Sequence, residues 1–306
     1  MDTIRRVPPS GPEGLEEMNG LLAESAPLAR AWAPQSCWAD PESGENCSWY
    51  HGFWQILRLL GVVTTLTHHA ELYIKALRPL IATGEFDRVM VSGSADYGLM
   101  SIVVEAFQQE GAVPDITVVD RCETALRLCQ WYAERFGIRI NTILSDLTSF
   151  HGNRSYDLVC AHSLLSRVPV EDHARIAAVW SGMLRSGGIL MMANNLYSGM
   201  TTDKVNVDPN QIPSYLERVA KAAAECPYHA ALPPPEELAR MARDYAAQMN
   251  ANVIGSRQQL IDLLQTHDFD FVETRFGDLI KDSNHRTSGA QVKKAKEYAW
   301  IVARRR

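Results

Sequence analysis

The sequence predicts an α/β fold, built as a doubly wound and mostly parallel sheet of seven strands. Between residues 88 and 193, short apolar runs alternate with segments that carry a helical pattern. The runs are apolar throughout, as expected for strands that are buried on both faces of a parallel sheet. Strands that alternate with helices form βαβ units with right-handed crossovers. Together these observations predict a sheet that is covered by helices on both faces.

Five strands are expected in the alternating region and two more near the end of the chain. Gly187 and Gly188 turn the chain into the fifth strand, and Ser256 is expected to cap a helix at 257–265 before the sixth. The helices between the first five strands are expected at 99–109, 122–136 and 171–184. The seven strands are expected at 88–91, 116–119, 138–144, 156–161, 189–193, 269–275 and 298–304.

Two further segments are expected to cover the sheet. Residues 1–80 carry one helical pattern at 15–32 and further helical patterns across 48–80, which Gly61 interrupts. They predict an N-terminal arm and helical lid, followed by the sheet domain at 81–306. Residues 196–255 predict a helical insertion after the fifth strand, with helices at 213–225 and 235–249. Each of these begins at a proline, which the first turn of a helix tolerates.

Composition limits the classes of partner. The 306 residues carry a net charge of −6, which argues against nucleic acid because phosphate binding needs concentrated Lys and Arg. No apolar run reaches the length of a membrane span, and no signal segment precedes the first helix, so a cytoplasmic protein without membrane contact is expected. A small-molecule substrate is expected, and a homodimer remains open.

The six cysteines include no CxxC pair, so no metal site is expected. Three of them fall within apolar patterns and are interpreted as small core residues. These three are Cys122, Cys129 and Cys160.

Chemistry-bearing residues follow the first three strands. The loop after the first strand runs Gly93-Ser94-Ala95-Asp96-Tyr97-Gly98, where glycine permits close approach of the backbone and the next helix offers free N–H groups to a carboxylate. Asp120 ends the second strand beside Arg121 and suits the two hydroxyls of a ribose. Asp146 follows the third strand, where with Leu147 it suits an adenine ring. Ligands of open parallel sheets bind at these strand ends, so a nucleoside site is predicted.

In this pattern the chain resembles the class I S-adenosylmethionine-dependent methyltransferase family, over residues 87–194 and 256–304. The family's glycine-rich loop matches Gly93, its acid after the second strand matches Asp120, and its Asp before the adenine matches Asp146. The resemblance implies a Rossmann-like domain at 81–306 with S-adenosylmethionine as cofactor.

The glycine-rich loop departs from the family pattern, because Ala95 replaces its middle glycine. Asp96 is expected to receive the amino group of the methionine moiety, to cap the helix, or both. The loop also lacks the GxGxxG spacing of a dinucleotide site, which argues against a nicotinamide enzyme.

Three residues are candidates for a catalytic base. Tyr50 and His51 lie in the most aromatic stretch of the chain, at 47–54, which is expected to close over the strand ends. A sulfonium beside aromatic rings would also gain cation–π stabilisation. His162 lies in the loop after the fourth strand, beside the expected position of the sulfonium, and it is expected to contact the cofactor as well.

Substrate contacts are expected from Asn194, Asn195 and Tyr197, where the fifth strand ends and the insertion begins. Other polar and aromatic residues of the insertion cannot be ranked from the sequence. They are Tyr215, Tyr228, His229 and Tyr245.

Three functions remain open at this point. The first is methyl transfer to a small molecule, in specialised biosynthesis, where positioning supplies much of the catalysis. The second keeps S-adenosylmethionine but attacks its aminocarboxypropyl arm, for example by ring closure to azetidine-2-carboxylate with release of methylthioadenosine. The third is a non-catalytic binding module of the same fold, with the Trp-rich stretch as a partner surface.

Overall fold

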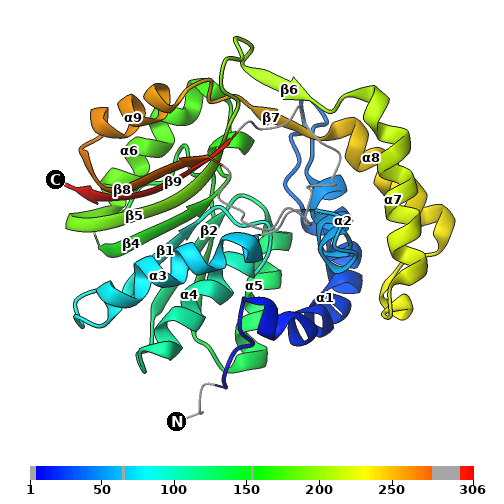
Figure 1. The fold of residues 1–306 in the computed structure, drawn as a ribbon, viewed down its shortest axis with the longest axis horizontal. Helices are drawn as coiled ribbons and strands as arrows, with labels where there is room; N and C mark the ends of the chain where they lie inside the picture. The colour runs from blue at the N-terminus through cyan, green and yellow to red at the C-terminus, as the bar shows by residue number, and fades with distance from the viewer. Residues whose placement is uncertain (1–4, 64–65, 153–154, 278–296) are drawn as a thin grey trace.

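A computed structural model describes residues 5–63, 66–152, 155–277 and 297–306. Their central element is a seven-stranded sheet with the order β3-β2-β1-β4-β5-β9-β8 (Figure 1). β9 runs antiparallel to both of its neighbours, and the remaining pairs in the sheet are parallel. The predicted fold class is therefore confirmed. The strands of this sheet are β1 (Arg88–Ser92), β2 (Asp115–Asp120), β3 (Ile140–Leu144), β4 (Tyr156–His162), β5 (Leu184–Leu196), β8 (Phe269–Gly277) and β9 (Glu297–Arg305).

Helices cover both faces of the sheet because neighbouring residues of its strands point in opposite directions. Val89 and Val91 of β1 belong to one apolar core, together with residues of α3, α4 and α5. Met90, which lies between them, belongs to the opposite core with α6 and α9. The helices are α3 (Ala70–Ile81), α4 (Gly98–Gln109), α5 (Glu123–Phe136), α6 (His173–Met183) and α9 (Arg257–Thr266).

The N-terminal helices and the insertion after β5 form one helical layer. α1 (Leu15–Ser36) and α2 (Ser48–Leu59) pack with α7 (Ile212–Glu225) and α8 (Pro235–Gln248) beside the carboxyl ends of β1 and β2 (Figure 1). Phe53 and Leu57 of α2 share a third apolar core with Val219 of α7 and Ala242 of α8. The N-terminal helices and the insertion, which are far apart in the sequence, thus pack together as one unit.

Two features of the fold differ from the sequence prediction. β5 begins at Leu184 rather than 189, because the irregular pairing with β4 between Tyr156 and Leu158 lets the double-glycine turn join the strand. The insertion also contains a strand pair that was not predicted, β6 (Lys204–Asn206) with β7 (Asn250–Asn252). Strands of three residues are too short for an alternating pattern to be read from sequence.

Most of the other boundaries agree with the prediction to within a few residues. α1 continues past the predicted end at 32 to Ser36, although Pro27 and Pro34 lie within it, and its alanines pack against the core. Ser256 caps α9 as predicted, since its hydroxyl accepts a hydrogen bond from the Gln259 amide. Of the helices that are described, none has both the length and the apolar character that crossing a membrane would require.

Candidate active site at the carboxyl ends of the strands

A cavity of about 550 Å³ lies where β1 to β4 end, under α2 and α8. This volume is typical of small-molecule sites, which span roughly 300–1,000 Å³. Thirteen of the fourteen site residues predicted from the sequence line this cavity. They are Tyr50, His51, Gly93, Ser94, Ala95, Asp96, Asp120, Arg121, Asp146, Leu147, His162, Asn195 and Tyr197.

Gly93 begins the loop that follows β1, and its position excludes a side chain. Its φ angle is +72°, in the left-handed region that favours glycine. A Cβ atom here would lie 2.7 Å from Cδ1 of Leu164, in the loop after β4. The Gly93 amide donates to the Val119 carbonyl at 2.9 Å, which holds the loop against β2. Gly93 lines the cavity, and its lack of a side chain leaves room for Leu164.

Asp120 fixes the geometry of the site, because its carboxylate joins two elements. One oxygen accepts the Ser94 amide and the other accepts the Cys122 amide, each at 2.7 Å. Burial raises the pKa of the Asp120 carboxyl to about 6. Asp146, by contrast, is exposed, and its Oδ1 accepts the amide and hydroxyl of Thr148, both at 2.7 Å.

Asp96 forms a buried ion pair with Arg58 of α2, which connects the helical layer to the loop after β1. The other oxygen of Asp96 accepts the amide of Gly98, the first residue of α4, at 2.6 Å. Arg58 also lines the cavity, although it was not predicted to do so. In the sequence it is a single cation within an apolar helical stripe, where an exposed charge on a long stem is the usual interpretation.

His162 lies in a hydrogen-bonded arrangement at the end of β4. Its Nδ1 is 3.3 Å from the hydroxyl of Tyr73, and its ring centroid is 5.2 Å from that of His69. Burial lowers the pKa of His162 well below its ordinary value, and the neighbouring His69 lowers it further. The imidazole is therefore neutral at physiological pH.

Tyr50 lies within an aromatic group that closes the opposite side of the cavity. Its ring stacks on Trp54 at 5.3 Å and on Tyr245 of α8 at 6.0 Å between centroids. Burial raises the pKa of Tyr50 to about 12, so the phenol is a hydrogen-bond donor at neutral pH and a poor base. Tyr245 thus becomes a site residue, whereas Tyr215, which the sequence could not separate from it, is buried between α7 and α8.

His51 lies beside three cysteines. Its Nδ1 is 3.3 Å from Sγ of Cys122 and 3.7 Å from Sγ of Cys37. Burial would lower the pKa of His51, but the contacts with Cys122 and Cys47 raise it well above its ordinary value. Cys129 and Cys160 are core residues as predicted. Cys122 is buried as predicted, but its thiol faces His51 and Cys37 at the edge of the cavity.

Asn194 is the predicted site residue that does not line the cavity. Its side chain is fully buried on the far side of β5, where the amide donates to the hydroxyl of Ser166 at 3.2 Å. Successive side chains of a strand point to opposite faces, so Asn195 reaches the cavity and Asn194 does not. The substrate role predicted for Asn194 is therefore wrong.

The fold of the chain is that of class I S-adenosylmethionine-dependent methyltransferases. A methyltransferase of this kind from Clostridium acetobutylicum superposes with a TM-score of 0.51 at 11% identity, over 83% of this chain and 98% of that one. Magnesium protoporphyrin IX methyltransferase from Synechocystis superposes at 0.47 with 14% identity, over 84% and 95% of the two chains. A Methanosarcina mazei methyltransferase gives 0.47 with 16% identity, over 74% and 97%. No protein-family model matches the sequence, and neither does any curated protein.

We expect Gly93→Ala to destabilise the protein more than Gly111→Ala does. Both glycines have a positive φ, so each substitution costs about 1–2 kcal/mol in backbone strain. Only at Gly93 does the new methyl group also meet another side chain, since the space around Gly111 is open. Urea denaturation of the two variants measures the difference. Equal losses of stability would show that Leu164 moves aside without cost.

Proposed function

We propose that this protein binds S-adenosylmethionine and transfers its methyl group to a small molecule. The observation that carries the proposal is that Gly93, Asp120 and Asp146 line one cavity, at the carboxyl ends of three adjacent strands. Gly93 supports the fit of the cofactor, because it lines the cavity in a left-handed conformation and its lack of a side chain lets the loop pack against Leu164. The methyltransferase fold of the chain agrees with it.

The polar groups of the cavity suit the parts of this cofactor. Asp120 would hold the ribose hydroxyls, and Asp146 with Leu147 would hold the adenine. Arg58 offers the methionine carboxylate a guanidinium that Asp96 already orients. Because Arg58 already pairs with Asp96, the Asp96 carboxylate would attract the amino group of the methionine moiety less strongly than a free carboxylate would. The sulfonium supplies an activated methyl group, and the surrounding protein positions it.

The remainder of the cavity suits a small organic acceptor. Asn195 and Tyr197 line it from β5 and the residue after β5, and Tyr245 and Met249 line it from the end of the insertion. This wall combines one amide, two phenols and a thioether, which favours a partly apolar molecule with a few polar groups. α2 and α8 cover the same space, and such covers exclude water from a reacting centre.

His162 is our candidate for the base that takes a proton from the acceptor. The single proton of Tyr73 Oη is donated to the Ala161 carbonyl at 2.6 Å. In its contact with His162, the Tyr73 oxygen can therefore only accept a hydrogen bond. The imidazole proton is then on Nδ1, and Nε2 carries a free electron pair. A neutral imidazole of this tautomer is ready to act as a base.

We expect S-adenosylmethionine to bind the wild-type protein and to bind Asp120→Asn at least ten-fold more weakly, a loss of about 1.4 kcal/mol. The amide has one acceptor oxygen where the carboxylate has two, and it lacks the charge. Isothermal titration calorimetry measures both affinities. Asp115→Asn, at the exposed opposite end of β2, is the matched control and should bind as the wild type does. Absence of binding to the wild type would refute the proposal.

We expect S-adenosylhomocysteine as the product when the protein is incubated with S-adenosylmethionine and a small-molecule extract. Mass spectrometry identifies the product directly. Methylthioadenosine in its place would mean that the aminocarboxypropyl arm is attacked. Binding without any turnover would instead favour a non-catalytic module.

We expect His162→Gln to lower product formation by about 100-fold, the lower range for loss of a general base. Its affinity for S-adenosylmethionine should fall by much less than its rate of product formation. Since burial depresses the pKa of His162, wild-type activity should fall only at a pH below about 6.5, the ordinary value for histidine. His151→Gln, at an exposed position, is the control. Unchanged turnover in His162→Gln would exclude this residue as the base.

A further inference from the structure

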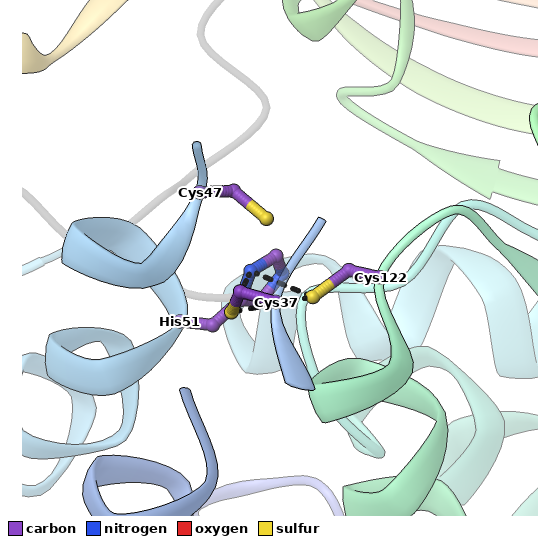
Figure 2. Close-up of side chains that lie close together, drawn as sticks. All are labelled: Cys37, Cys47, His51 and Cys122. Atoms are coloured by element: carbon purple, nitrogen blue, oxygen red, sulfur yellow. Dashed lines mark hydrogen bonds between the residues drawn. The ribbon is translucent and has the colours of Figure 1, made fainter. Parts of the chain in front are cut away.

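Three cysteines and one histidine converge at the edge of the cavity, outside the chemistry proposed above. Cys37 follows the end of α1, Cys47 directly precedes α2, His51 lies in the first turn of α2, and Cys122 directly precedes α5. Their thiols and the ring of His51 point toward one another (Figure 2). Within this cluster the two cysteines nearest in sequence, Cys37 and Cys47, are ten residues apart, so no CxxC pair marks the site in the sequence.

The distances among Cys37, His51 and Cys122 are close to those of a tetrahedral metal site. A zinc ion with bonds of about 2.3 Å to sulfur and 2.0–2.1 Å to nitrogen holds two sulfurs about 3.8 Å apart, and sulfur and nitrogen about 3.5 Å apart. Here Cys37 and Cys122 are 3.4 Å apart at sulfur, and Nδ1 of His51 lies 3.3 Å and 3.7 Å from these sulfurs. All four donor atoms lie within 4.8 Å of one another.

We propose that Cys37, Cys47, His51 and Cys122 bind one Zn²⁺ ion. Three thiolates and one imidazole form a closed tetrahedral set, which is the composition of structural rather than catalytic zinc sites. Binding needs three thiolates and a neutral His51, so every proton on the sulfurs and on Nδ1 of His51 would pass to solvent, and the zinc with its ligands would carry a net charge of −1. Nδ1 of His51 would be the ligand atom, since it faces the sulfurs.

Such an ion would fasten the helical layer to the sheet. Its ligands come from the end of α1 and the start of α2 on one side, and from the residue before α5 on the other. The amide of Cys122 also donates to Asp120, so the same segment carries a metal ligand and contacts the central carboxylate of the cavity. The proposed zinc would therefore hold the lid beside the cofactor site, and it does not depend on which reaction the site performs.

A Cys37–Cys122 disulfide is the competing interpretation of the short sulfur–sulfur distance. It would use two of the four groups, and it would leave the convergence of Cys47 and His51 on the same point without a cause. It also requires an oxidant, whereas zinc binding is only an exchange of protons for a metal ion. The full set of four donors therefore favours the metal.

The test is elemental analysis of the full chain, purified in a reducing buffer without a metal-affinity step. We expect about one zinc per chain. After removal of zinc with a chelator, added Co²⁺ should produce the absorption bands of thiolate coordination. Cys47→Ser and Cys122→Ser should each lower zinc retention at least ten-fold in the presence of a competing chelator. Cys226→Ser, which alters a cysteine outside the cluster, should retain zinc as the wild type does.

Three outcomes would overturn the proposal. One is a metal-free protein that takes up neither Zn²⁺ nor Co²⁺ when reduced. Another is iron with inorganic sulfide in place of zinc. The last is a Cys37–Cys122 disulfide, seen by mass spectrometry of the unreduced protein as it is purified. The cobalt titration of the wild type decides the question even if a cysteine variant fails to fold.

Discussion

The carboxylate of Asp120 holds the cavity in shape, because its two oxygens accept amides from two different elements. Through Ser94 it fixes the loop after β1, and through Cys122 it fixes the start of α5. The Arg58–Asp96 pair then connects that loop to α2 and so to the helical layer. Each connection is a hydrogen bond to a charged group, which is stronger than one between neutral groups. The position of the lid thus depends on residues that also line the cavity.

The sheet and its strand ends could be predicted because they depend on local patterns. The apolar runs predict buried strands. Because the strands are parallel, their carboxyl ends bring Gly93, Asp120 and Asp146 to one edge of the sheet, however the connecting helices pack. The face of a residue near a strand end was harder to predict. Asn194 and Asn195 are identical in type and adjacent in sequence, and only the register of β5 with β9 decides which one reaches the cavity.

The remaining site residues could not be predicted because they depend on packing between distant segments. Arg58 becomes a site residue only when α2 lies against the loop after β1, and Tyr245 only when α8 lies against α2. Likewise, the cysteine–histidine cluster exists only in three dimensions, since its members come from three separate elements. Rules that search for short spacings along the chain do not detect such sites.

The two histidines that the sequence nominated as bases show how surroundings assign roles to one residue type. His162 is buried next to another histidine, so its pKa is lowered and the neutral ring keeps a free electron pair. His51 is more deeply buried, but its Nδ1 faces sulfur atoms that stabilise a proton or a metal ion at that position. In either state Nδ1 is engaged and unavailable for proton transfer. These surroundings favour His162 over His51 as the proposed base, and they suit His51 to the proposed metal site.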